Sequence, residues 1–260
     1  MTNQDRDDNA AASEESQLRP HPILDRYYAD HAQRATFVSR MFDASAHHYD
    51  RVSNLISFGT DRAYRRRSLL QAGLISRMTV LDVACGTGMI AGPAAEIVGP
   101  DGRVIGLDLS SGMLRELVRR GRLCYPVQGR AEQLPIAESS IDFLSMAYAL
   151  RHIPDLRDCF SEFLRVLKPG GTVLLLEITT PSVPFFYHLF KLYLKFVVPK
   201  IAMASTFNRD NHTLMDYFWD TVDQCVKQET VVGAMRQVGF TQIHHLTKYG
   251  ILSEYKARKP

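Results

Sequence analysis

From residue 78 onward the chain alternates between apolar runs and amphipathic segments. Continuous apolar runs predict buried strands, and apolar residues at three- or four-residue spacing predict helices. The predicted strands lie at 78–84, 102–110, 124–129, 140–150 and 172–178, and the predicted helices at 89–98, 111–121 and 155–171. We expect the last helix to end at the Pro-Gly-Gly of residues 169–171. Strands alternating with helices predict a doubly wound, mostly parallel α/β sheet.

Two regions fall outside this alternation. Residues 21–75 precede the first strand and look helical from residue 23, and residues 183–225 follow the fifth strand. After the second region the pattern predicts a helix at 229–240 and a final pair of strands, which raises the sheet to seven strands. Because doubly wound folds bind ligands beyond the carboxyl ends of their strands, both regions are expected to form a substrate lid. Residues 76–260 then form the ligand-binding domain.

The composition describes one ordinary globular domain. The chain has 260 residues, of which 45% are hydrophobic and 23% charged, and its net charge of +3 does not favour nucleic acid as a partner. Four scattered cysteines have no metal-binding spacing, so we expect no metal site and a cytoplasmic location. Residues 1–20 are polar, unlike a secretory signal, and are expected to be a disordered tail.

A glycine loop follows the first predicted strand in "LDVACGTGMIAG", residues 81–92. Gly86, Gly88 and Ala91 fit the pattern G-x-G-x-x-[GA] of dinucleotide-binding folds. Asp108 lies twenty residues after Gly88, at the end of the second strand, where an acid accepts hydrogen bonds from ribose hydroxyls. These features suit NAD, FAD and S-adenosylmethionine alike.

Asp82 favours S-adenosylmethionine over NAD and FAD. We expect its carboxylate at the mouth of the loop, where it would repel a pyrophosphate by roughly 1–4 kcal/mol per charge pair at 4 Å. S-adenosylmethionine has no phosphate and carries a sulfonium and an ammonium. The loop residues Ala84 and Thr87 are further candidate contacts of this cofactor, as is Leu109 after the second strand. Met113 is either an adenine contact or a core residue.

Several motifs together resemble the ubiquinone/menaquinone biosynthesis C-methyltransferases, a family of class I S-adenosylmethionine-dependent methyltransferases. The resemblance covers roughly residues 38–257 and is carried by "MFDASAHHYDRVSNLISFGTDRAYRR" (41–66), "LDVACGTG", "GLDLSSGML", "AEQLPI", "YALRHIPD" and "LRVLKPGG", in the family's order. It implies methyl transfer to a ring carbon of a polyprenylated quinol precursor.

The chain departs from this family at two candidate site residues. Arg130 replaces the acid that the family uses against the adenine amino group, although the backbone of Ala131 is still expected to bond the adenine. His152 stands where the family has asparagine. The segment 203–214 also differs, so the chain is identified as a diverged member.

Arg151 and His152 follow the fourth strand and are the candidate catalytic residues. A guanidinium stabilises a developing phenolate, and an imidazole accepts a proton at physiological pH. His152 is equally interpretable as a hydrogen-bonded loop residue. Tyr49 and Asp50 are second candidates, with capping or packing as the alternative. The arginine runs at 65–67 and 119–122 are expected on solvated helix faces.

The composition of residues 181–204 is consistent with a hydrophobic methyl acceptor. This stretch is aromatic and aliphatic but carries three lysines, which disfavours a membrane span. It is interpretable as a helix over the active site, as an interfacial helix at the inner face of the membrane, or as a core helix. Alternative acceptors are lipids and terpenoids, and a non-methylating cofactor-binding relative stays open, as does a homodimer or a biosynthetic complex.

Overall fold

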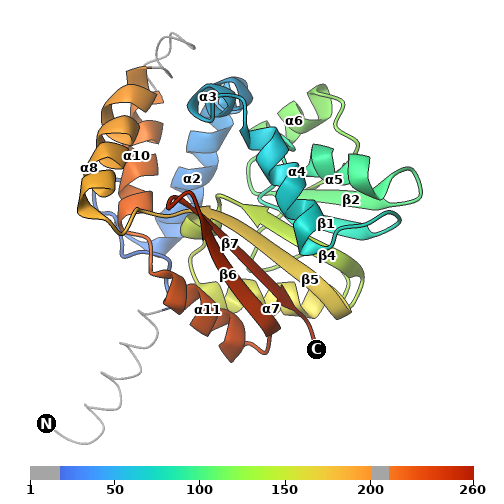
Figure 1. Cartoon of the computed structure of the whole chain (residues 1–260). Coiled ribbons are helices and arrows are strands. Elements are labelled where there is room, and N and C mark those ends of the chain that lie inside the picture. The colour runs from blue at the N-terminus through green and yellow to red at the C-terminus, as the bar shows by residue number, and fades with distance from the viewer. Residues whose placement is uncertain (1–17, 201–210) are drawn as a thin grey trace, which may run out of the picture.

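The computed structural model describes residues 18–200 and 211–260, and its centre is one twisted sheet (Figure 1). The strand order is β3-β2-β1-β4-β5-β7-β6. The bounds are β1 Thr79–Val83, β2 Arg103–Asp108, β3 Tyr125–Gln128, β4 Ile141–Ala147, β5 Leu167–Ile178, β6 Thr241–Lys248 and β7 Leu252–Arg258. All pairs are parallel except those of β7, which runs antiparallel to β5 and β6. The predicted seven-stranded, mostly parallel sheet is therefore confirmed.

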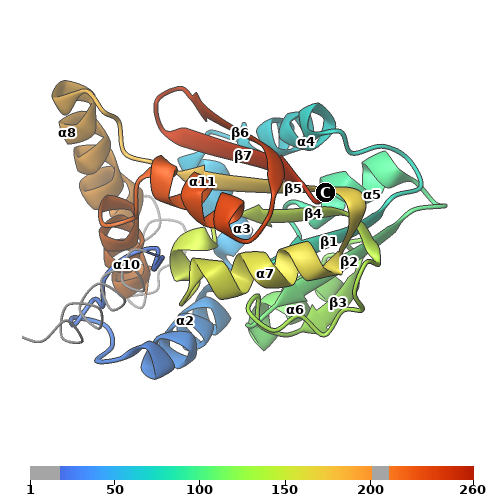
Figure 2. The same ribbon diagram turned by 90° about the horizontal axis from the view of Figure 1, so that it is seen from below.

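Helices cover both faces of the sheet (Figure 2). The elements that follow the strands are α5 Ala91–Val98, α6 Ser111–Arg119, the short helix η1 Leu150–His152, α7 Leu156–Val166 and α11 Gln228–Gln237. One buried cluster joins α4 (Asp61–Ala72) and α5 to β1, β2, β4 and β5. A second cluster packs α7 and α11 against the opposite face.

The predicted end of the helix at 155–171 is wrong. Helix α7 ends at Val166, and β5 begins at the next residue. Leu167 pairs with Ile141, whereas Thr172 pairs with Phe143, so the Pro-Gly-Gly lies in an irregular stretch of the strand. The extra residues are accommodated there because Gly170 adopts a φ of 75°.

The lid regions lie together at one end of the sheet (Figure 1). Apart from α4, which packs on the sheet, their helices are α2 His31–Ser45, α3 Tyr49–Ile56, α8 Pro184–Leu192, the π-helical η2 Tyr193–Val197 and α10 Asn211–Asp223. A buried cluster ties α3 to η2 and α10 through Val52, Leu194 and Trp219. The described chain is not helical between residues 23 and 30, and most of the predicted tail lies outside the described residues. Within the described part, no helix is long and apolar enough to cross a membrane.

Candidate active site

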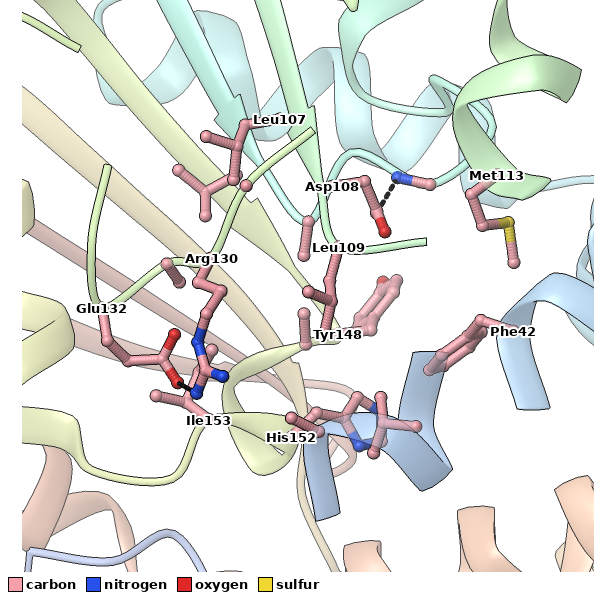
Figure 3. Close-up of a pocket in the computed structure, with 18 of the residues that line it drawn as sticks. Phe42, Leu107, Asp108, Leu109, Met113, Arg130, Glu132, Tyr148, His152 and Ile153 are labelled. Atoms are coloured by element: carbon pink, nitrogen blue, oxygen red, sulfur yellow. Dashed lines mark hydrogen bonds and ion pairs between the residues drawn. The ribbon is translucent and has the colours of Figure 1, made fainter. Parts of the chain in front are cut away.

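The glycine loop and the end of β2 form a narrow cleft. Ala84 and Gly86 turn the chain after β1 with φ values of 54° and 55°. The carboxylate of Asp108 accepts hydrogen bonds from the backbone N–H groups of Gly86 and Ser110, both at 2.8 Å. Burial raises the pKa of Asp108 above its ordinary value. These bonds fix the carboxylate at the wall of the cleft (Figure 3).

The residues around this cleft fit a nucleoside. A carboxylate has about four lone-pair sites, so Asp108 keeps two for ribose hydroxyls. A Cβ on Gly86 would meet nothing closer than the sulfur of Met113 at 4.0 Å, which leaves room along the loop. The cleft is also lined by Ala84, Leu109, Met113, Arg130, Ala131 and Glu132. Sequence reasoning missed Glu132.

Arg130 occupies the edge of the cleft. Its guanidinium lies 3.5 Å from the carboxylate of Glu132, and its side chain is half exposed. Figure 3 shows both side chains beside the hollow. The adenine contact that the family makes with an acid would therefore face an arginine–glutamate pair, and the predicted contribution of Arg130 to cofactor binding stays a prediction.

The structure does not place Asp82 at the mouth of the loop. Its side chain is 1% exposed, accepts a hydrogen bond from Ser145 at 2.8 Å, and is not among the residues that line the cleft. Burial raises its pKa to about 7, so it is only partly charged at neutral pH. Asp82 is therefore buried against Ser145, and the prediction of a fixed carboxylate at the mouth of the loop is wrong. Gly88 and Thr87, two further predicted cofactor contacts, are also not among the residues that line the cleft.

Two carboxylates connect the lid to the glycine loop and to α6, which lie next to the cofactor cleft. Asp50 accepts a hydrogen bond from Thr87 and pairs with Arg120 at 2.9 Å and with Arg122 at 3.6 Å. These two arginines are not the solvated charges that the sequence suggested. Asp50 lines neither described cavity, so its contacts hold α3 of the lid against the glycine loop and the end of α6.

Asp43 makes the second connection, which sequence reasoning did not single out. It accepts hydrogen bonds from the hydroxyl of Ser110 at 2.6 Å and from the backbone of Gly112 at 2.7 Å. A Cβ on Gly112 would lie 2.8 Å from the carboxylate of Asp43, so the approach requires glycine. The only sequence signal was the position of Asp43 in the opening motif.

A second, larger cavity lies under the lid. Its volume is about 660 Å³, and most of its lining side chains are apolar or aromatic. Four side chains line both this cavity and the cofactor cleft, namely Phe42, Tyr49, Tyr148 and His152. Figure 3 shows three of them, Phe42, Tyr148 and His152, around the space next to Asp108 and Met113. The two cavities therefore meet at this junction.

The ring of His152 is held firmly at the junction. It stacks on Tyr217 at a centroid distance of 5.4 Å, and its Nδ1 lies 3.2 Å from the Tyr217 hydroxyl oxygen. Burial, reinforced by Arg151 and Arg34, lowers the pKa of His152 well below its ordinary value. Its Nε2 has no hydrogen-bond partner among the residues that the structure describes. The imidazole is therefore neutral at physiological pH, with one nitrogen uncommitted.

Two buried arginines line the large cavity, and both are paired. Arg151 contacts Glu177 at 2.5 Å, with each side chain 4% exposed. Arg65 contacts Asp61 at 2.7 Å and lies over the ring of Tyr148 at 4.7 Å. Arg65 was expected on a solvated face, and this prediction was wrong because α4 packs it under the lid. Both cations are therefore near the junction but partly neutralised.

The sheet order, the turn after β1 and the carboxylate at the end of β2 define a class I S-adenosylmethionine-dependent methyltransferase. Residues 29–259 match the model of the ubiE/COQ5 methyltransferase family, and the chain belongs to this family. It is 37% identical to a demethylmenaquinone methyltransferase of Staphylococcus aureus (strain JH9) over 174 residues, which are 66% of this chain and 72% of that protein. Family and relative support S-adenosylmethionine-dependent methylation in quinone biosynthesis, as the motifs predict.

Solved structures share the fold at low identity. A methyltransferase from Aquifex aeolicus has a TM-score of 0.56 and 17% identity, and the match covers 81% of this chain and 98% of that one. Phosphoethanolamine N-methyltransferase 2 of Haemonchus contortus, solved with S-adenosyl-L-methionine, has a TM-score of 0.59 and 16% identity, over 84% and 57% of the two chains. At such identities the likeness shows the fold, and the acceptor must be argued from the site.

Proposed function

We propose that this enzyme transfers a methyl group to a ring carbon of a hydrophobic prenylated quinol precursor. The observation that carries the proposal is the apolar cavity of about 660 Å³ that meets the cofactor cleft at four side chains. A cavity of this size and character suits an apolar ring system better than a sugar or a nucleotide. The name of the Staphylococcus aureus relative supports a quinol of the menaquinone type.

Methyl transfer to a ring carbon requires that this carbon is placed in line with the methyl group and that the negative charge on the ring oxygen is stabilised. When bound, S-adenosylmethionine supplies an electrophilic methyl group, and the rate then depends on in-line placement of the ring carbon. Ionisation of a neighbouring ring hydroxyl makes this carbon nucleophilic. Arg151 lines the cavity and would stabilise the resulting oxyanion.

A proton acceptor is also needed at the junction. The free Nε2 of His152 is the first candidate because the imidazole is neutral, although the lowered pKa makes it a weak base. Tyr49, the next candidate catalytic residue, lines both cavities, but burial raises its pKa, so its hydroxyl stays protonated and would hydrogen-bond the acceptor rather than take its proton. Asp50 ranks below both because its carboxylate is already bonded to Thr87 and Arg120.

The test is an assay of the purified enzyme with isotopically labelled S-adenosylmethionine and chemically reduced quinols. We expect mass spectrometry to find the label on a ring carbon of a prenylated benzoquinol or naphthoquinol. His152→Asn and Arg151→Lys should lower turnover while cofactor affinity is kept. Methylation of a phospholipid or a terpenoid but of no quinol would overturn the proposal in favour of the alternative acceptors.

The outer face of α8 offers a way to reach such an acceptor at a membrane surface. Phe185, Leu189, Leu192 and Phe196 follow helical spacing and are 54–71% exposed. Lys195 is exposed next to Phe196 and would meet anionic headgroups, whereas the ammonium of Lys191 lies 5.8 Å from the ring centroids of Tyr187 and Trp219. We place the enzyme in the cytoplasm, against the inner face of the membrane.

Sedimentation with vesicles tests this location. Vesicles with anionic lipid should bind the enzyme, and the double variant Phe185→Ser/Phe196→Ser should stay in the supernatant. Ile75→Ser is the control, because Ile75 is 60% exposed and belongs to the segment between α4 and β1 rather than to α8. Equal binding of all three proteins would contradict the proposal. A homodimer or a biosynthetic complex also stays a prediction, to be checked by light scattering.

A further inference from the structure

Aromatic residues with left-handed backbones gather around the large cavity. In the described part of the chain, seven non-glycine residues have a positive φ: Phe58, Arg77, Ala84, Ser139, Tyr148, Gln242 and Tyr249. The three aromatic ones all line this cavity. A bulky side chain disfavours the left-handed region, so such residues need a reason. For Tyr148 the reason is its position at the junction, where it lines both cavities. Phe58 and Tyr249 line only the large cavity, so their backbone conformation needs another reason.

Phe58 and Tyr249 lie at the mouth of the cavity. Phe58 is in the turn between α3 and α4 and is 80% exposed, and Tyr249 is in the turn between β6 and β7 and is 81% exposed. A side chain that lines a cavity and is also this exposed must sit at its opening. The β6–β7 turn is held against α4 because the ammonium of Lys248 lies 3.0 Å from the amide oxygen of Gln71.

The turns themselves do not require aromatic residues. In both, the aromatic residue is followed by a glycine with positive φ, at 51° and 74° for Phe58-Gly59 and at 55° and 71° for Tyr249-Gly250. Tyr249-Gly250 joins two antiparallel strands and fits a type I′ turn, which prefers Asn-Gly. Phe58 instead ends α3 in a Schellman cap, in which the N–H of Gly59 bonds to the carbonyl of Asn54 and the left-handed position usually holds glycine or asparagine. Each turn therefore carries an exposed aromatic ring where asparagine would suit the backbone better and hydrate more favourably.

We propose that Phe58 and Tyr249 form a clamp on the hydrocarbon tail of the acceptor, where the tail leaves the cavity. The proposal rests on the proposed function. A cavity of about 660 Å³ is of the size that encloses a drug-sized ligand. It encloses the ring, but a tail of many branched five-carbon units exceeds it and must pass through the mouth. Two apolar rings at the mouth would shield the first exposed units of the tail from water.

The experiment compares acceptors that share one ring and differ only in the tail. The purified enzyme is assayed with a tail-less quinol and with a quinol that carries two or three prenyl units, without lipid and below the concentration at which the acceptors aggregate. The readout is the ratio of kcat/KM for the tailed and the tail-less acceptor. The variants are Phe58→Asn, Tyr249→Asn and the double variant, and Leu123→Asn is the control because Leu123 is 80% exposed and lines neither cavity.

We expect the ratio to fall by about tenfold in the double variant, which corresponds to losing ~50 Å² of apolar cover on the tail. The fall should appear in KM, the thermal midpoint should stay equal or rise because asparagine suits the turn, and Leu123→Asn should keep the ratio of the wild type. An unchanged ratio, or equal losses for both acceptors, would overturn the clamp. A wild type that methylates no quinol would instead overturn the proposed function, and the clamp with it.

Discussion

The pair of Arg151 and Glu177 can be tested by separating its charge from its packing. The perturbation is a cycle of Arg151→Met, Glu177→Gln and the double variant. Methionine keeps much of the contact of Arg151 with the ring of Phe218, which lies 4.8 Å from the guanidinium carbon. Glutamine keeps the shape of Glu177. The cycle therefore isolates the interaction between the two charges.

The expected magnitude follows from the burial of the pair. Both side chains are 4% exposed and their charged atoms are 2.5 Å apart. Removal of one partner from such a pair costs about 3–5 kcal/mol, because the other charge stays buried without compensation. Coulomb's law gives a similar scale for the attraction itself, about 4 kcal/mol when the centres of the two delocalised charges are taken as about 4 Å apart at an effective dielectric constant of 20. We therefore expect single losses of about 3–5 kcal/mol and a coupling of about 2–4 kcal/mol.

The assay is urea unfolding followed by two probes. Trp219, the only tryptophan of the chain, is buried in α10 and reports on the lid, whereas far-ultraviolet circular dichroism reports on the whole fold. Coincident transitions would justify a two-state treatment. A coupling below ~0.5 kcal/mol would refute the reasoning. The double variant should regain stability but not turnover, because the cation next to the acceptor is gone; recovered turnover would limit Arg151 to a structural role.

Three further predictions concern the cofactor cleft and pH. Asp108→Ala should weaken S-adenosylmethionine binding by ~1.5–3 kcal/mol in calorimetry, through loss of charged hydrogen bonds, and unchanged affinity of the folded variant would contradict this. Ala84→Gly should raise the free energy of unfolding by about 0.5–1 kcal/mol, because relief of the φ of 54° exceeds the added entropy of the unfolded chain, and a lower thermal midpoint would contradict this. Burial lowers the pKa of His21 from 6.5 to about 4, and that of His152 also falls. Because the unfolded chain binds more protons at these two histidines, their contribution to the free energy of unfolding is full above pH ~6.5 and falls as the pH drops towards 4, whereas the raised pKa of Asp82 acts in the opposite direction. The difference in free energy of unfolding between the wild type and a His21→Gln variant therefore isolates the histidine part in denaturation curves across this range, and a difference that does not change with pH would be against it.

Much of the fold followed from local sequence patterns. Strands β1, β4 and β5 are buried on both faces, so their apolar runs are nearly continuous and identify them without any tertiary information. The glycine loop and Asp108 lie at the ends of adjacent parallel strands, so the order of elements alone brings them together. Family membership likewise followed from motifs in their order along the chain.

The errors arose where a residue's neighbours lie far away in the sequence. Asp82 was expected as a fixed carboxylate at the mouth of the loop, but pairing of β1 with β4 buries it against Ser145, and burial raises its pKa. Arg120 was expected in solvent, but the lid brings Asp50 to it from seventy residues away.

The sequence by itself therefore determined the sheet, the cofactor loop and the class of enzyme, because periodicity and motif spacing are properties of neighbouring residues. Only the tertiary structure decided the charge of Asp82, the pairing of Arg151 with Glu177 and the junction at Phe42 and His152. The physical reason is that burial and Coulomb interactions depend on distance in space. Packing of the lid over the strand ends sets that distance, and no local pattern encodes it.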